Sequence, residues 1–304
     1  MKKMLRALIF AALICLTLCG CSSGPLYDNA DRYTAGETEI REDIRALDIH
    51  WICGSVTVEY HEGDTVILSE RAKKSLPEED VLRWWLDGTT LRVQFSAPML
   101  QRWTPHPEKE LIVSLPAGLV LENADITTIS GKLQCDGLAA ERAVLSATSG
   151  DIYASCTASD LSIHSTSGSI TAVCDADNIS VDLVSGVIDL THTGAAESLT
   201  TQSTSGTIHL NIDEVEQVDI HPVSGGVTME CAVLPEALTV YTVSGGVALY
   251  VPGDAGFTAE VKTTSGRFNS DLLMKTDGSR YFCGDGKCSV NIHTVSADIS
   301  IYEK

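Results

Sequence analysis

The dipeptide Ser-Gly recurs at nearly constant spacing through the second half of the chain. Successive glycines are 19, 18, 18, 20, 19, 20 and 21 residues apart, and Ser296-Ala297 is a degenerate further copy. The serines of the regular copies are Ser130, Ser149, Ser167, Ser185, Ser205, Ser224, Ser244 and Ser265. A fixed period of this length indicates a fold built by stacking equivalent units.

Apolar residues alternate with polar ones on both sides of each Ser-Gly, which is the pattern of strands that meet at a corner. Two residues after the glycine position every copy is apolar: Leu133, Ile152, Ile170, Ile188, Ile208, Val227, Val247, Phe268 and Ile299. The repeat is too short for a propeller blade of about 40 residues, but it suffices for one coil of a solenoid. We therefore predict an all-β fold, a parallel β-solenoid of about nine to ten two-stranded coils, right-handed by the usual crossover rule.

The repeat also divides the chain. Residues 118–273 form the Ser-Gly solenoid, and residues 38–117 form an N-terminal coil and β-rich cap, in which Cys53-Gly54 takes the Ser-Gly place. Residues 77–86 are predicted to form a short helix because acidic residues occupy its first turn. Residues 274–304 are a hairpin insertion followed by the final coil, since Asp-Gly pairs in this segment favour tight turns.

The first twenty residues have the features of an export signal. Lys2, Lys3 and Arg6 precede an apolar run over residues 8–18 that is too short to span a membrane. The run ends in Leu18-Cys19-Gly20-Cys21, which resembles a bacterial lipobox, so residues 1–20 would be a lipoprotein signal peptide and Cys21 the lipidated N-terminus. The alternative is an ordinary signal peptide with incidental cysteines. Residues 21–37 are small and polar, as in a flexible tether.

Composition excludes some classes of partner. The net charge of the whole chain is −20, and loss of three basic residues with the signal peptide makes it −23. Because nucleic-acid binding needs a basic face, no nucleic-acid partner is expected. Lipid chains on Cys21 would instead make the membrane a partner and hold the protein on the outside of the cytoplasmic membrane.

The repeated serines invite a catalytic interpretation, which the pattern argues against. A serine nucleophile needs one adjacent base and one oxyanion site, whereas these serines recur in every coil. We expect them to point inward and to bond to one another as a structural ladder at the corner. No catalytic residue is predicted.

The cysteines follow the repeat as well. Cys135, Cys156, Cys174 and Cys231 occupy inward positions, where a thiol packs as a small hydrophobe. A disulfide between Cys156 and Cys174 in adjacent coils would be geometrically demanding. Cys283 and Cys288 lie close in sequence and are the best candidates for a disulfide in an exported protein.

Neither metal nor cofactor is expected. His164, Asp182 and His221 share one outward position in different coils, where cross-strand pairing explains them better than a metal or acid–base site. The Asp-rich corners match neither of the common calcium-binding loops. No tight Cys-x-x-Cys spacing of a zinc site occurs.

All four tryptophans, Trp51, Trp84, Trp85 and Trp103, belong to the first 103 residues. They can seal the open end of the solenoid, whose edge strands would otherwise aggregate. The alternative is an aromatic platform for sugar rings or a peptide. Both interpretations place them in the cap.

The spaced [Thr/Val]-Ser-Gly-x-[Ile/Val] copies, the Leu115-Pro116-Ala117-Gly118 entry and the closing residues 294–301 resemble a known bacterial family. It is the family of β-strand-repeat "putative adhesins", a domain of unknown function, and the resemblance covers residues 38–304. It implies the repeat architecture and supplies no catalytic residues. The chain departs from the family pattern at Cys53 and Ala297.

Three functions compete. The first is a non-enzymatic surface lipoprotein whose solenoid serves adhesion, scaffolding or envelope sensing, with an envelope protein as partner. The second is a binder of cell-wall glycan or a small ligand through the tryptophan-rich cap. The third is a polysaccharide lyase or hydrolase, which rests on fold analogy alone.

Overall fold

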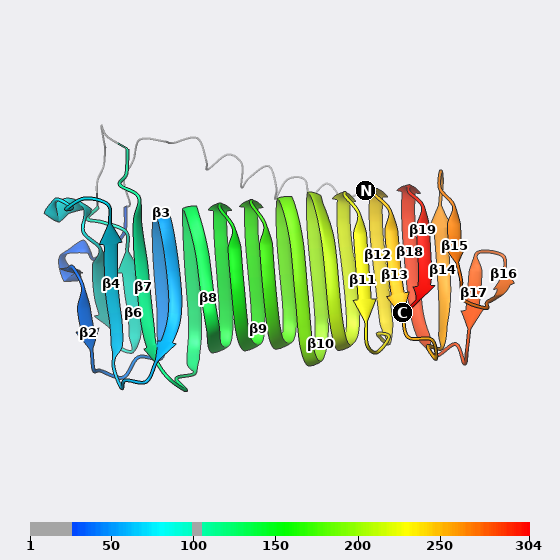
Figure 1. The fold of residues 1–304 in the computed structure, drawn as a ribbon, viewed down its shortest axis with the longest axis horizontal. Helices are drawn as coiled ribbons and strands as arrows, with labels where there is room; N and C mark the ends of the chain where they lie inside the picture. The colour runs from blue at the N-terminus through cyan, green and yellow to red at the C-terminus, as the bar shows by residue number, and fades with distance from the viewer. Residues whose placement is uncertain (1–25, 99–104) are drawn as a thin grey trace.

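The chain forms a long rod of stacked β-coils, described here from a computed structural model that covers residues 26–98 and 105–304 (Figure 1). One continuous 19-stranded sheet winds through these residues. The expected all-β, parallel β-solenoid is confirmed. Over the described ranges, no helix is long and apolar enough to cross a membrane.

The central coils come from β8 (Leu121–Ser149), β9 (Ile152–Ser167) and β10 (Ile170–Ser224). These strands pair in parallel with equivalent residues opposite one another, so that Leu133, Ile152 and Ile170 form one continuous inward row. All three side chains are fully buried. The apolar alternation read from the sequence therefore becomes a single core along the rod axis.

Glycine at the corner is required by the distance between coils. A Cβ atom on Gly168 would lie 2.3 Å from the Gly150 carbonyl oxygen, and one on Gly186 would lie 2.1 Å from that of Gly168. The φ angles of Gly168 and Gly186 are 130° and 141°, which other residues rarely adopt. The corner is thus a column of glycines in backbone contact.

The repeated serines do not point inward, so this part of the sequence prediction is wrong. All eight are exposed, although Ser149, Ser167 and Ser185 do stack in register. The alternation of inward and outward side chains ends two residues before each serine. The chain turns the corner between that position and the second residue after the glycine. The buried hydroxyls belong to these earlier positions: Thr128 and Ser203 each donate to the carbonyl of the corner glycine three residues on, at 3.4 Å.

Coils are not stacked in sequence order at the two ends. At the N-terminal end β3 (Ala46–His61) has β8 on one side and, on the other, β6 (Thr90–Gln94) and β7 (Lys109–Pro116). The first coil of the chain is therefore the second coil of the rod. Cys53-Gly54 lies opposite Ser130-Gly131, as the repeat predicted.

The C-terminal end repeats this arrangement. The last coil consists of β18 (Cys288–Ser296) and β19 (Ile299–Glu303). On one side it pairs with β12 (Ala237–Ser244) and β13 (Val247–Val251). On the other side it pairs with β14 (Phe257–Thr263) and β15 (Phe268–Ser270). Coils that neighbour each other in the rod are therefore not always successive in sequence. Every coil carries the same apolar pattern, so the pattern fits either order.

The predicted hairpin insertion exists and closes this end. β16 (Lys275–Asp277) and β17 (Arg280–Cys283) pair antiparallel, and β17 also pairs antiparallel with β14. The hairpin therefore covers the outer edge of β14. With the hairpin on that edge, the coil of β14 and β15 needs another coil only on its inner side. The coil of β18 and β19 has a coil on each side. The hairpin therefore fixes the coil of β14 and β15 as the outermost one.

Short strands complete the cap. β4 (Val66–Ala72) pairs antiparallel with β7 and with β2 (Thr38–Ile40), while β5 (Arg83–Asp87) pairs antiparallel with β6 and with β1 (Thr34–Ala35). Outside the cap, β11 (Val227–Cys231) continues the shaft, and a short 3-10 turn at Ala30–Arg32 precedes β1.

The helix predicted for residues 77–86 is wrong. Only Glu78–Asp80 forms a single 3-10 turn, and Arg83–Asp87 is β5. Pairing with β6 and the strand preference of adjacent aromatic residues outweigh the acidic start of the segment.

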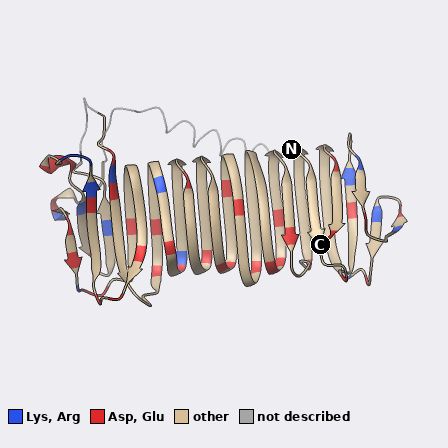
Figure 2. Cartoon of the chain, viewed as in Figure 1, with Lys and Arg blue, Asp and Glu red and all other residues tan. Residues whose placement is uncertain are grey.

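Charge is distributed unevenly along the rod. Between Arg142 and Lys262 the sequence contains 15 acidic residues and neither Lys nor Arg. Basic residues are consequently found in the cap, on β8 and in the C-terminal coils (Figure 2). Between Arg142 and Lys262 the Asp and Glu side chains make the shaft anionic.

The order of the C-terminal coils can be tested by engineered disulfides. Thr239 lies opposite Asn291, which lies opposite Glu260. Adjacent strands are about 4.8 Å apart and alternate ones about 9.6 Å, and a disulfide spans at most about 7 Å between Cα atoms. The pair Thr239→Cys/Asn291→Cys should therefore cross-link under mild oxidation, as detected by peptide mapping, and the control Thr239→Cys/Glu260→Cys should not. The reverse result would restore sequential stacking.

Candidate functional site

Trp51, Trp84 and Trp85, the tryptophans that the structure describes, do not form a common platform. Trp51 is 1% exposed, so its interpretation as a ligand contact is wrong, whereas sealing the end of the core is consistent with its position. Trp84 and Trp85 are neighbours on β5 and therefore face opposite sides of the strand. Trp103 lies outside the described residues.

The Trp85 ring has three neighbours within the cap. The guanidinium of Arg32 lies 5.2 Å and that of Arg92 6.0 Å from the ring centre, and Tyr33 meets the ring edge-on at 5.7 Å. Cation–π contacts of this kind stabilise the fold of the cap. They leave little of the ring for a sugar or a peptide.

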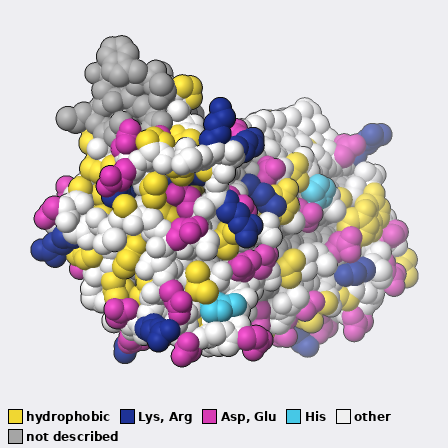
Figure 3. All heavy atoms as spheres, turned by 60° about the vertical axis from the view of Figure 1, so that its left-hand side comes forward, with side chains coloured by type: hydrophobic (Ala, Val, Ile, Leu, Met, Phe, Trp, Pro, Cys, Tyr) yellow, Lys and Arg dark blue, Asp and Glu magenta, His cyan; other side chains and the backbone are white. Residues whose placement is uncertain are grey.

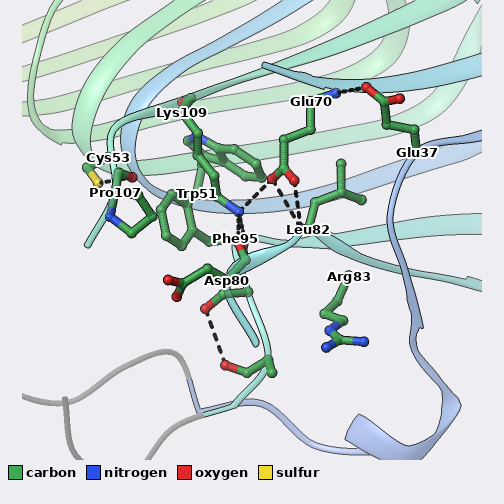
Figure 4. Close-up of polar contacts among 12 residues, drawn as sticks. Glu37, Trp51, Cys53, Glu70, Asp80, Leu82, Arg83, Phe95, Pro107 and Lys109 are labelled. Carbon is green, nitrogen blue, oxygen red and sulfur yellow. Dashed lines mark hydrogen bonds and ion pairs between the residues drawn. The ribbon is translucent and has the colours of Figure 1, made fainter. Parts of the chain in front are cut away.

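The cap also contains a buried ammonium group, that of Lys109 (Figure 4). Lys109 begins β7, and its side chain is fully buried. Its Nζ donates to Glu70 Oε1 at 2.6 Å, to the Asp80 carbonyl oxygen at 2.6 Å and to the Phe95 carbonyl oxygen. Three acceptors for three N–H donors satisfy the ammonium completely.

Aromatic rings and a second set of hydrogen bonds enclose this ion pair. Nζ lies 4.1 Å from the centre of the Phe95 ring and 4.8 Å from that of Trp51. The Glu70 carboxylate also accepts from the Leu82 N–H at 3.1 and 3.2 Å. Burial lowers the pKa of Lys109, and the nearby carboxylate of Glu70 opposes this shift.

This arrangement stabilises the fold of the cap and does not suit Lys109 to act in catalysis. A nucleophilic or general-base lysine must expose its nitrogen to a substrate, whereas every proton of Lys109 is engaged inside the cap. The group joins β4, β7, the residue directly after β6 (Phe95) and the turn at Glu78–Asp80. Sequence reasoning missed it, since nothing in the pattern distinguishes Lys109 from an exposed lysine at a strand end.

A second polar network lies on the outward face of β3 and β6. His50 Nε2 is 2.9 Å from Asp48 Oδ1, and Arg92 bonds both Asp48 and Asp87. The hydrogen bond from His50 lowers the pKa of Asp48, and the same bond raises the pKa of His50. Figure 3 shows acidic and basic side chains interspersed over the face of this end that it presents, so this face carries no patch of one charge sign.

The interior thiols occupy the predicted core positions. Cys135, Cys156, Cys174 and Cys231 are buried and free, and Cys156 lies opposite Cys174. Burial raises the pKa of Cys156, Cys174 and Cys231 to about 12, so these thiols are protonated and unreactive.

The proposed disulfide between Cys283 and Cys288 is not present. Both are free thiols, and both lie opposite Phe257, on the two different sides of β14. Two strand spacings separate them by about 10 Å, beyond the reach of a disulfide. The connecting loop is short in sequence but crosses a strand, which sequence spacing does not reveal.

The outward histidines behave as cross-strand partners. His164 Nδ1 is 3.0 Å from Asp182 Oδ2 in the next coil. His221 stacks instead on Tyr241. Within the described ranges, no group of three or more His, Cys, Asp or Glu side chains could hold a metal ion. Cys21, the predicted lipidation site, lies outside these ranges.

Comparison with known proteins identifies the architecture. The family model of Toastrack DUF4097 matches residues 113–217 and 176–302, which together make up more than half of the chain. The chain belongs to the Toastrack DUF4097 family. This confirms the resemblance to a repeat family of unknown function. No curated protein matches the chain.

Several solved structures are similar to it. One is a "putative lipid binding protein" from Parabacteroides distasonis, 10% identical, with a TM-score of 0.47 over 88% of this chain and 96% of that one. Another is a "putative adhesin" from the same organism, 11% identical, with a TM-score of 0.46 over 89% and 97%. A third is a "putative cell adhesion protein" from Clostridium sporogenes, 13% identical, with a TM-score of 0.20 over 89% and 100%. These scores are too low to support an argument about the function of this Toastrack chain.

The Lys109–Glu70 pair generates a stability prediction. Lys109→Met leaves a buried carboxylate without its cation and should lower the free energy of unfolding by about 3–5 kcal/mol, measured by chemical denaturation. Adding Glu70→Gln should recover part of this loss. The exposed pair of Lys73 with Glu108 is the control, because Lys73→Met should cost no more than about 0.5 kcal/mol. Equal effects of the two lysine changes would refute the role of the buried pair.

The His50–Asp48 pair generates a pH prediction. With the pKa of His50 raised, the stabilisation from its charge is complete below about pH 6.5 and is lost as pH rises through the folded-state pKa. At the acid end it is lost as pH falls through the lowered pKa of Asp48. An NMR titration of the His50 ring should give a midpoint above about 6.5, and Asp48→Asn should lower it, whereas the distant control Glu122→Gln should not. A midpoint unaffected by Asp48→Asn would contradict the pairing.

Proposed function

We propose that this chain is an exported, lipid-anchored surface protein whose rod binds partners in adhesion and catalyses no reaction. The observation that carries the proposal is the outer face of the shaft. Equivalent residues recur there coil after coil in register, as in Ser149, Ser167 and Ser185. Such a surface offers the same group many times to one extended partner.

The cap supports the same interpretation. Its buried titratable pair, Lys109 and Glu70, is fully engaged in hydrogen bonds, so it stabilises the end of the rod. An enzyme acting on a polysaccharide would need carboxylates held at a defined separation around one bond. Over the part of the chain that the structure describes, the carboxylates with lowered pKa values are each paired with a basic side chain: Asp48, Glu260, Asp285 and Asp298.

Stiffness and anchoring together favour display at a surface. One hydrogen-bonded sheet and one core run the length of the rod, so the coils cannot move as separate bodies. A lipidated Cys21 followed by the polar tether would hold this rod at a membrane without a spanning helix. The anionic shaft would repel acidic surfaces and keep the rod extended from them.

A binder acting through the tryptophan-rich cap is the weaker alternative. Trp51 is inside the core, and Trp85 is covered by Arg32, Arg92 and Tyr33. Ligand recognition by the rod would therefore use residues of the shaft.

The anchor is tested in cells. Cys21→Ala should move the protein from the membrane fraction to the soluble exported fraction and abolish adhesion of the producing cells, because no lipid can be attached. Ser22→Ala is the matched control and should leave both unchanged. Membrane retention of Cys21→Ala would refute the lipid anchor. Cells that produce the wild-type protein but adhere no better than cells lacking it would refute the adhesive role.

A further inference from the structure

One outward face near the C-terminal end differs from the rest of the shaft. Three rings lie side by side on neighbouring strands: His221 on β10, Tyr241 on β12 and His293 on β18. Two residues further along the same strands stand Val223, Val243 and Val295, which are 50%, 40% and 50% exposed. We call these six residues the ring strip.

The rings are stacked on one another. Tyr241 is 6.2 Å from His221 with an interplanar angle of 28°, and 4.9 Å from His293 with an angle of 34°. Tyr241 is nonetheless 51% exposed. Because neighbouring rings cover each other's faces, the strip presents ring edges, the phenol hydroxyl and imidazole nitrogens to a ligand, beside the methyl groups of the valines.

A polar row borders the rings on the side away from the valines. Asp219, Thr239 and Asn291 occupy equivalent outward positions two residues before the rings. Gln217 donates to Asp219 at 2.7 Å, and Asn291 donates to Ser289 at 3.2 Å, which orients both side chains. The face thus combines hydrogen-bonding groups with apolar methyl groups, as needed to recognise a molecule that has both hydroxyls and C–H surfaces.

The size of the strip argues against a protein partner. Three strands at about 4.8 Å and five residues at about 3.3 Å cover on the order of 200 Å². A stable protein interface buries about 800 Å² on each partner. An oligosaccharide of a few rings fits the smaller area.

Register and charge define the ligand further. Parallel coils place side chains at equivalent positions one strand spacing apart along the rod axis, which suits a ligand that itself repeats along a line. The coils on one side of the strip have 15 acidic residues and neither Lys nor Arg between Arg142 and Lys262. On the other side Lys262 lies opposite His293, but its ammonium is paired with Glu260. An acidic polymer would therefore be repelled. We propose that the ring strip binds a linear, uncharged polysaccharide that lies along the rod axis. This inference rests on the proposed binding function and assigns it a ligand class and a site.

The test is binding of defined hexasaccharides to the mature chain by calorimetry. The neutral probes are the β-1,4-linked hexamers of glucose and of N-acetylglucosamine, and the acidic probe is the hexamer of galacturonic acid. A neutral hexamer should bind, and the acidic one should bind at least tenfold more weakly. Tyr241→Ala and Val243→Asp should each weaken binding of the neutral hexamer at least tenfold.

Tyr250→Ala is the matched control. Tyr250 also lies on an outward face and pairs with a neighbouring ring, Tyr302 at 5.5 Å, but it belongs to β13 on another side of the coil. It should leave binding unchanged. Thermal melts of all three variants should match the wild type, because each altered side chain points outward.

The opposite results overturn the proposal. Failure of both neutral hexamers to bind would refute the ligand class, and equal effects of Tyr241→Ala and Tyr250→Ala would refute the site. Adhesion of cells that carry Tyr241→Ala separates this proposal from the proposed function. If those cells adhere like the wild type, the ring strip is not the adhesive site, although the rod still serves adhesion.

Discussion

Backbone contact at the glycine corner is the constraint on which the rest of the rod depends. The carbonyl of each corner glycine lies where the next coil's Cβ would be, at 2.1–2.3 Å for Gly186 and Gly168. This contact sets the coils one strand spacing apart and keeps them in register. Register then decides which side chains enter the core and which form outward rows, so the surface of the shaft follows from the corner.

A stack of parallel coils has two open edges, and the protein closes them differently. At the N-terminal end, antiparallel strands cover the first coils, and Lys109 ties them together through Glu70 and two carbonyls. At the C-terminal end, a hairpin covers β14 and the last coil is inserted beneath it. In both cases a terminal coil of the chain gains two neighbours, which protects the chain ends from fraying.

Much of the shaft could be predicted because its determinants are local and repeated. Ile152 and Ile170 are inward because the alternation around each glycine fixes their direction, and Cys156 and Cys174 follow the same rule. The rule fails for the serines, since strand alternation stops before the corner. It also fails for the order of the coils, because equivalent coils are interchangeable in pattern.

The candidate sites were harder to predict because they depend on contacts distant in sequence. Lys109 meets Glu70 from another strand, and Trp51 is covered by a segment that comes more than forty residues later. Cys283 and Cys288 are close in sequence but separated by a strand. The ring strip required the inserted coil, since His293 meets Tyr241 only when the last coil lies beside β12. In each case the contact depends on the tertiary arrangement of the strands, which the periodicity of the sequence does not specify.

The most direct test of the glycine constraint is the free energy of unfolding of Gly186→Ala compared with Ser185→Ala. The two residues are neighbours at one corner, but only Gly186 has a positive φ and a backbone atom within 2.1 Å of its missing Cβ. Gly186→Ala should lower the free energy of unfolding by about 2 kcal/mol or more, and the exposed Ser185→Ala should change it by no more than about 0.5 kcal/mol. Equal and small effects would show that coil stacking does not depend on the glycine column.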